Sequence, residues 1–356
     1  MQNKLESMIS KKAHDIGAVI DKIFATGTMI DDDTVSVSKL SFAHTPADRV
    51  EVIYPDHLGN TIQSRIHDHA FGHLGSKFGI PRGFLKDMAH GEMWQKDFAA
   101  HTLSEFSANV DRDRLLLRSV QGEVRAAVSD RYRRLNSARI FMAFLQAAQS
   151  TGSRLVDSHN GETRSFMEVV NPEVVEFDTP LNGRNYGVFG SRIRNSDFGH
   201  GALELRSFML NVKCLNGMVG ETMLHEVHLG GVISESIEVS DETVEKDTEA
   251  RASLVRDTMN SIYSVTNTER MIESIKGASS REIDIQEETK RLPKLGLSKT
   301  EVEAFQNIML NNDPANGLEG APTMWKFANG LTAMARDSEP ERKRDVEKIV
   351  GELLGI

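Results

Sequence analysis

The chain has 356 residues, of which 39% are apolar and 26% charged, and its formal net charge is −10. This composition is that of a globular protein with room for two or three domains, and the negative charge argues against indiscriminate binding to nucleic acids. The one cysteine, Cys214, excludes an intrachain disulfide and is expected to be a packing residue. No run reaches the ~18 apolar residues of a membrane span, so we expect a cytoplasmic protein without membrane contacts.

Residues 1–110 are expected to form an N-terminal region of helices and short strands. Apolar residues from Leu5 to Ile23 recur every three or four positions, which predicts an amphipathic helix. The three acids Asp31–Asp33 are interpreted as a solvated loop before the strand-like segment VSVSKLSF at 35–42. A second helix is expected over residues 68–79, because Gly79 and the following Pro81 are typical of a helix end.

Residues 111–238 are expected to form a core of antiparallel hairpins. RLLLRSV and VRAAVSDRYRRL flank a QGE turn, RLVDS and RSFMEVV flank an HNGE turn, and a third hairpin turns at NSDFGHG. Hairpins in series favour an α+β fold, in which an antiparallel hairpin-built sheet packs on helices.

Residues 239–356 are expected to form an acidic helical C-terminal region. Apolar positions from Val244 to Ile262 indicate one long helix, and Ser298 with Glu301 forms a capping box for another. The final helices are expected in TMWKFANGLTAMARD and PERKRDVEKIVGELL.

Arginine is concentrated between Arg112 and Lys213, where 14 arginines and one lysine stand against 11 acids. Guanidinium groups suit two-pronged contacts to phosphates, and interleaved aromatic rings suit base stacking. On an expected strand over residues 124–133, alternation places several arginines on one face. The predicted nucleic-acid contacts are Arg118, Arg125, Arg131, Tyr132, Arg133, Arg134, Tyr186, Arg192, Arg194, Asn195 and His200. The alternative is that these arginines pair with neighbouring carboxylates.

Histidines form the other candidate cluster. His67, His69 and His73 lie within seven residues, and His69 with His73 has the i, i+4 spacing that lets two imidazoles meet one metal ion; His225 and His228 form a further pair. Neither cluster includes a carboxylate at the spacing of a known metallohydrolase motif, so structural roles are the default and no cofactor is expected.

Three separated blocks carry a family resemblance: LLLRSVQGEVRAAVSDRYRRLNSARIF, NSDFGHGALELRSFMLNVKCLNGMV and TMWKFANGLTAMARDSEPERKRDVEKIVGELL. They resemble a phage- and plasmid-borne family known as domain of unknown function 932, whose members travel with genes for replication, recombination and single-strand handling. A weaker, architectural similarity is to phage single-strand annealing recombinases of the Rad-fifty-two-like group.

These observations predict a phage or mobile-element protein of the bacterial cytoplasm that binds single-stranded DNA. As a homo-oligomer it would anneal strands, and its acidic C-terminal region would contact host or phage replication proteins. One alternative is a metal-dependent enzyme that acts on nucleic acid through the histidine clusters. Another is a non-catalytic interaction module, whose arginine face docks an acidic partner or the chain's own acidic last third.

Overall fold

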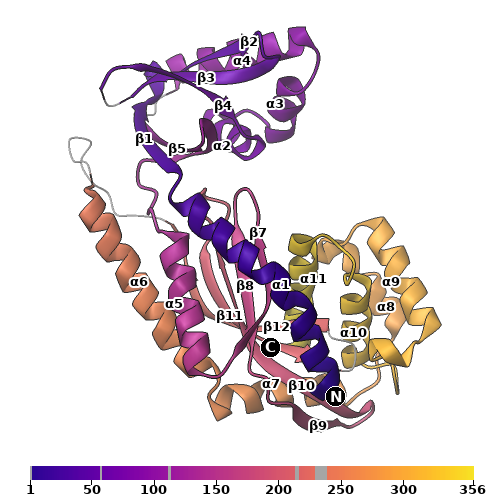
Figure 1. Cartoon of the computed structure of the whole chain (residues 1–356). Helices are drawn as coiled ribbons and strands as arrows, with labels where there is room; N and C mark the ends of the chain where they lie inside the picture. Colours follow the sequence, from indigo (N-terminus) through magenta and orange to yellow (C-terminus); the bar gives the residue numbers. More distant parts are fainter. Residues whose placement is uncertain (1, 57, 111–113, 213–215, 229–238) are drawn as a thin grey trace.

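The computed structural model describes residues 2–56, 58–110, 114–212, 216–228 and 239–356, and it confirms the predicted mixture of helices with antiparallel sheet. Two six-stranded sheets lie in two lobes (Figure 1). Within the described ranges, no helix is long and apolar enough to cross a membrane. Cys214 lies outside these ranges.

The first lobe is built on a sheet with strand order β1-β5-β6-β4-β3-β2, in which β4 and β6 run parallel and the other neighbours antiparallel. Its strands are β1 (Ile30–Ser36), β2 (Ser41–Thr45), β3 (Arg49–Pro55), β4 (Thr61–Ile66), β5 (Arg114–Val120) and β6 (Glu123–Ser129). Helices α2 (Asp68–Phe78) and α4 (Met93–Asn109) pack on it, and α3 (Arg82–Ala89) packs on these two helices.

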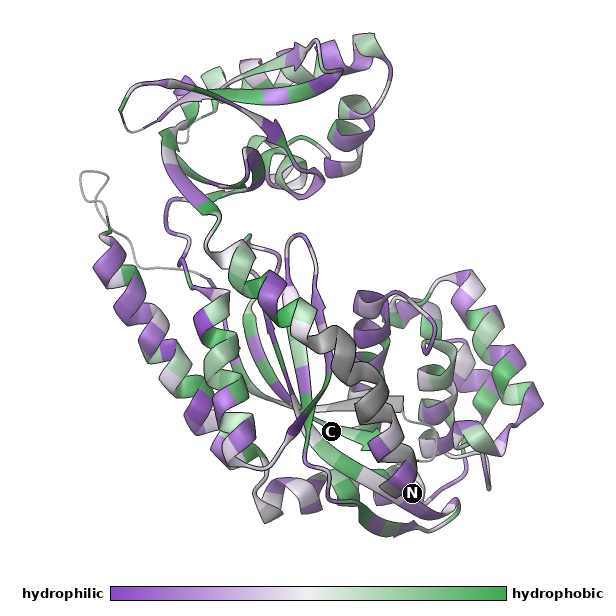
Figure 2. Ribbon diagram, viewed as in Figure 1, coloured by the Kyte–Doolittle hydropathy of each residue, from purple (hydrophilic) through white to green (hydrophobic). Residues whose placement is uncertain are grey.

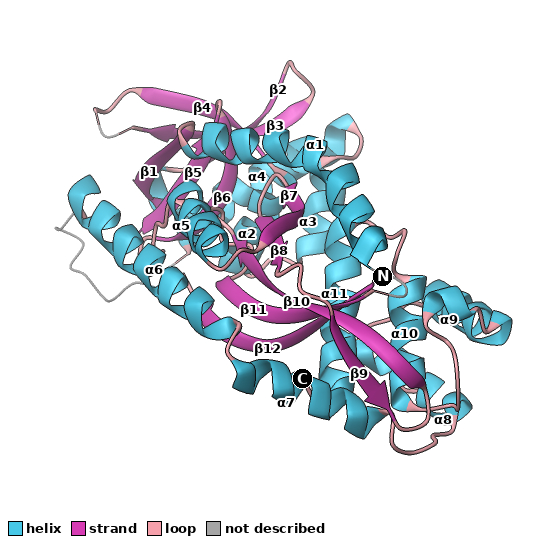
Figure 3. Ribbon diagram, turned by 60° about the horizontal axis from the view of Figure 1, so that its bottom comes forward, coloured by secondary structure: helices cyan, strands magenta, loops and turns pink. Residues whose placement is uncertain are grey.

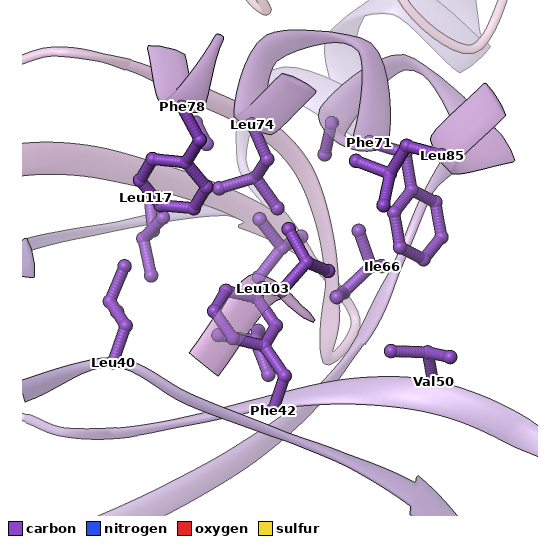
Figure 4. Packing of buried hydrophobic residues seen from close by; sticks show 14 of the residues in the cluster. Leu40, Phe42, Val50, Ile66, Phe71, Leu74, Phe78, Leu85, Leu103 and Leu117 are labelled. Atoms are coloured by element: carbon purple, nitrogen blue, oxygen red, sulfur yellow. The ribbon is translucent and has the colours of Figure 1, made fainter. Parts of the chain in front are cut away.

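The core of this lobe lies between the sheet and its helices. Alternate residues of β3, namely Val50, Val52 and Tyr54, are buried, as the two-residue strand period requires. Figure 4 shows side chains of the strand segments meeting those of α2, α3 and α4 in one cluster. The predicted end of α2 is confirmed, because Gly79 adopts the left-handed conformation with φ 72°.

Three expectations for the first lobe need correction. The segment 35–42 is not one strand, because a 3-10 turn at Val37–Lys39 divides it between β1 and β2 at opposite edges of the sheet. The acids Asp31–Asp33 lie in β1 instead of a loop, and Asp33 accepts a hydrogen bond from the Tyr54 hydroxyl at 3.1 Å. The boundary expected near residue 110 falls inside this lobe, since β5 and β6 complete its sheet.

The second lobe contains the sheet β12-β11-β10-β8-β7, with β9 paired to β10. Its strands are β7 (Arg154–Asn160), β8 (Ser165–Val170), β9 (Val175–Thr179), β10 (Gly183–Asn195), β11 (Leu203–Asn211) and β12 (Asn216–Glu226). The second and third predicted hairpins are confirmed as β7–β8 and β10–β11. Figure 2 shows hydrophobic residues along these strands, as expected of a sheet covered on both faces.

Helices cover the two faces of the second sheet. Met167 and Ile193 face α5 (Ser137–Ser150) and α6 (Asp241–Ile262), whereas the alternate residues Glu168 and Arg192 face α11 (Pro340–Leu354). Figure 3 shows the last helices on the opposite side of the sheet from α5 and α6. The remaining elements are α1 (Gln2–Gly27), α7 (Val265–Ala278), α8 (Ile285–Thr289), η2 (Leu292–Leu295), α9 (Lys299–Asn311), η3 (Pro314–Asn316) and α10 (Met324–Met334).

The two lobes meet at the loop 196–202, which joins β10 to β11. The backbone carbonyl of Phe198 accepts a hydrogen bond from His69 Nε2 at 3.0 Å, and that of Ser196 accepts one from the Tyr132 hydroxyl at 2.9 Å. Gly199 has φ 71°, and a Cβ there would lie 2.8 Å from a methyl group of Val128. This glycine is therefore required both by its backbone conformation and by the close approach of β6.

Candidate nucleic-acid interface

The predicted nucleic-acid contacts do not converge on one surface. Some lie in the junction between the lobes, some on the segment that follows β6, and two on the α11 face of β10. The predicted strand 124–133 ends at Ser129 and is followed by a turn, so strand alternation cannot align Arg125 with Arg131 and Arg133. The prediction of a continuous arginine-lined face, which depended on this alternation, is therefore wrong.

Arg118 is part of the junction between the lobes, where it is 5% exposed. Its Nε donates to Asp32 at 2.7 Å, and its Nη1 donates to the backbone carbonyl of Asp197. Burial opposes the charged form, but the carboxylates of Asp32 and Asp197 raise the pKa of Arg118 above its usual value. The Tyr132 ring lies 5.7 Å from this guanidinium group. Arg118 and Tyr132 thus hold the loop 196–202 and are not available to stack or bind a strand.

Arg125, Arg133 and Arg134 also have partners within the chain. Arg125 lies 3.5 Å from Glu123 and donates to the Glu162 carbonyl at 3.2 Å. Arg133 contacts Glu226 at 3.1 Å and Asp247 at 3.3 Å, whereas Arg134 donates to the Val239 carbonyl at 3.1 Å. Of these three arginines, Arg133 fits best the alternative interpretation that the arginines pair with carboxylates.

The other predicted contacts differ in their exposure. Asn195 is buried, contacting Ser137 at 2.8 Å and His228 at 2.9 Å, and Tyr186 packs in an apolar cluster of the second sheet. His200 contacts the Thr163 hydroxyl at 2.7 Å. Arg131 is exposed, and its side chain has no hydrogen bond or ion pair to any described residue. Of this group, Arg131 alone is freely presented to solvent.

Several cations gather between the second sheet and α11. A pocket there is lined by six cationic side chains, three carboxylates and one aromatic ring. The lining residues are Arg164, Phe166, Arg192, Arg194, Glu204, Arg206, Glu341, Arg344, Asp345 and Lys348. Two of the predicted contacts, Arg192 and Arg194, are therefore brought together with cations from β11, α11 and the residue preceding β8.

The floor of this pocket is a buried ionic network. Arg192, 7% exposed, contacts Glu168 at 2.7 Å and Glu347 at 2.5 Å. Arg344 of α11 contacts the same two acids at 2.5 and 3.3 Å and also pairs with Asp157. Although burial opposes it, the charges of Arg192 and Arg344 hold the pKa of Glu347 below its usual value. Arg192 is thus a structural cation, and the prediction that it contacts nucleic acid is corrected.

The rim of the pocket is less constrained than its floor. Glu204 lies 3.3 Å from Arg206 and 3.8 Å from Arg194, and Arg164 is hydrogen bonded to Glu341. Burial and the charges of Arg164 and Arg192 lower the pKa of Arg194, against the attraction of Glu204. Lys348 is exposed and, within the described part of the chain, makes no ion pair or hydrogen bond. Lys348 is thus the exposed cation of this rim, whereas the side chains of Arg164, Arg194 and Arg206 are 15, 26 and 16% exposed.

Sequence reasoning missed most of this rim. Arg206 could have been found from hairpin register, because a turn centred on Gly199 places it opposite Arg192. Arg344 and Lys348 gave no such signal, since helix α11 reaches the pocket from more than a hundred residues away in the sequence.

The histidines pack together in the junction and do not form a metal centre in the described structure. The ring centroid of His69 lies 4.2 Å from that of His73 and 4.7 Å from that of His200. Within the described ranges, no three His, Cys, Asp or Glu side chains are placed to hold one metal ion. His67 instead contacts Glu162 at 2.8 Å, His225 contacts Glu204 at 3.2 Å, and His228 stacks on Tyr132.

Burial and neighbouring positive charges keep the junction histidines neutral. They lower the pKa of His69 to about 4 and that of His73 to about 3. The geometry agrees, because His73 Nδ1 accepts a hydrogen bond from the backbone N–H of Ala127 at 3.3 Å. A protonated Nδ1 could not accept that bond.

No family model, curated protein or solved structure matches this chain. The assignment of its site therefore rests on its own geometry.

Because Arg118 is buried and Arg131 is exposed, we expect replacement by methionine to destabilise the protein strongly at the first position and hardly at all at the second. Arg118→Met removes the cation that pairs with the half-buried Asp32 and lies near the buried Asp197, which should lower the free energy of unfolding by about 3–5 kcal/mol. Arg131→Met, at an exposed position, should change it by less than about 0.5 kcal/mol. Urea unfolding of the two variants measures both values, and equal effects would contradict the structural role of Arg118.

The junction histidines predict a loss of stability in acid. Unfolded histidines bind protons near pH 6.5, but His69 and His73 in the folded state do so only near pH 4 and pH 3. The free energy of unfolding should thus fall as the pH drops from about 6.5 to about 4, by roughly 1.4 kcal/mol per pKa unit that separates the two states.

His73→Phe should make this pH dependence shallower, because one of the depressed protonation sites is gone. The same substitution at His101, which is exposed on α4, is the matched control. Denaturant unfolding of the parent protein, His73→Phe and His101→Phe at pH 7 and pH 5 measures how much the free energy of unfolding of each depends on pH. A pH dependence unchanged in His73→Phe would show that this ring is not responsible.

Proposed function

We propose that this chain binds single-stranded nucleic acid, and that the phosphates contact the rim cations of the pocket between the second sheet and α11. The observation that carries the proposal is the convergence of six cations from β10, β11, α11 and the start of β8 on one pocket. The contacts proposed are Arg194, Arg206 and Lys348, with Arg164 at the edge. They replace the wider set of arginines expected from the sequence.

The chemistry of the rim favours a phosphate ligand. Arginine forks can hold phosphate oxygens in two-pronged contacts, and Lys348 adds a mobile positive charge. Burial is the main cause of the lowered pKa of Arg194, and repulsion from Arg164 and Arg192 adds to it. A bound anion would relieve the repulsion. Because the whole chain carries a charge of −10, such binding is confined to this local reversal of sign.

Strand annealing would follow if several copies assembled and held extended strands side by side, as the resemblance to mobile-element proteins implies. The first lobe offers one feature suited to contact between copies. Phe84, Trp94 and Phe98 are 45, 66 and 47% exposed, and the rings of Phe84 and Phe98 lie 6.3 Å apart. Sedimentation with and without an oligonucleotide tests assembly, and a single monomeric species in both cases would exclude annealing by an oligomer.

Replication proteins of the host or the phage remain proposed partners of the acidic C-terminal region. Helix α11 of this region also forms one wall of the cationic pocket.

Binding should depend on salt in the way that phosphate contacts require. The logarithm of the affinity for a labelled oligothymidylate should fall with the logarithm of salt concentration, by about 0.7 for each phosphate contact. Lys348→Met should weaken binding and reduce this slope by about 0.7, since it removes one contact. Fluorescence anisotropy over a salt series measures both quantities.

The matched control is Lys299→Met, at a lysine whose side chain is 92% exposed on α9, away from the pocket. It should leave affinity and slope unchanged. A flat salt response in the parent protein would refute nucleic-acid binding, and equal effects of the two lysine substitutions would refute the pocket as its site.

A further inference from the structure

We propose that Glu341 and Asp345 of α11 are internal competitors for the cationic pocket: a bound phosphate must displace Glu341 from Arg164 and overcome the negative charge of Asp345. This inference rests on the proposed function and adds its regulation: the chain holds its own site partly neutralised. Two observations support it. The acids of α11 line the pocket, and some contacts between α11 and the rest of the lobe are buried whereas others are partly exposed.

The acids of α11 lie where a strand's phosphates would have to go. Glu341 and Asp345 are four residues apart on one helix, so their side chains lie on the same face, and both line the pocket. Glu341 accepts a hydrogen bond from Arg164, and the negative charge of Asp345 acts on Arg164 and Arg194. With Glu204, these carboxylates account for all three acids that line the pocket.

Helix α11 contacts the rest of the second lobe in two ways: through buried contacts that stay in place, here called permanent, and through a partly exposed ion pair that can open, here called exchangeable. The permanent part is buried: Arg344 and Glu347 are 6 and 2% exposed in the ionic network, and Val346, Val350 and Leu354 lie in the apolar core. The exchangeable part is the rim, where the Glu341 side chain is 35% exposed. A half-exposed carboxylate can leave its partner by rotating its side chain, whereas the buried anchor keeps the helix docked.

Neutralising the two acids should therefore tighten binding without undocking α11. Glu341→Gln with Asp345→Asn preserves side-chain shape and removes two negative charges from the rim. We expect the affinity for a labelled oligothymidylate to rise roughly three- to tenfold at low salt, and the gain to shrink as salt screens the rim. Asp345→Asn alone should give part of the gain, and it breaks no hydrogen bond within the described structure.

Glu352→Gln is the matched control for Asp345→Asn, because it removes one negative charge at an exposed position of α11 outside the pocket. Its affinity should equal that of the parent protein. The urea midpoint of each variant is measured alongside, so that a change in folding is separated from a change in binding.

The outcomes separate this inference from the function on which it rests. If the parent binds with a salt-dependent affinity and the double variant binds more tightly than Glu352→Gln, the competition is supported. If only the double variant binds, binding by the parent protein is refuted, and the two acids are shown to block the pocket. If the parent binds but neither Asp345→Asn nor the double variant gains affinity, the competition is refuted and the proposed function stands. If no protein binds at low salt, both are refuted.

Discussion

The arrangement of the second lobe depends on the buried ionic network in which Arg192 and Arg344 share Glu168 and Glu347. Charges removed from water are costly unless each finds an opposite charge at short range, so this network tolerates one alignment of α11 on the sheet. A shift of the helix by one residue would leave at least one of these side chains buried without its partner. The network therefore fixes the position of α11 more than it adds stability.

The same requirement explains why a segment rich in arginine became largely interior. A guanidinium group has five N–H donors on a rigid plane, which lets a single side chain join several acceptors from different elements. Arg118 uses this to connect Asp32 of β1 with the backbone of the loop 196–202, and it lies over Tyr132. A preference for arginine over lysine is thus equally suited to holding two lobes together and to gripping phosphates.

The junction and the pocket lie next to each other on one structural unit, the β10–β11 hairpin, because Arg194 and Glu204 of the pocket are the last paired residues before the turn. Its turn enters the first lobe beside the histidines, and its strands carry the cations that α11 covers. Gly199 permits the turn to approach β6. Arg194 on β10, before the turn, and Arg206 on β11, after it, both line the pocket. The geometry that joins the lobes therefore also sets which cations of the hairpin meet α11.

Local patterns in the sequence determined much of the secondary structure. The three hairpins, the helix ending at Gly79 and the capping box at Ser298 were all predicted, because turn chemistry, strand alternation and helix capping act over a few residues. The α+β class followed from the same patterns. The sequence also identified Arg192 and Arg194 as cations of interest, but not whether solvent could reach them.

Only the tertiary structure decided which arginines are exposed and what they face. Asp32 and Arg118 are 86 residues apart and Arg192 and Glu347 are 155 apart, so no local pattern could pair them. The interruption of the segment 35–42 and the assignment of β5 and β6 to the first lobe depended on strand pairing over similar separations. The physical reason is that charge compensation is set by distance in space, whereas the sequence records only order along the chain.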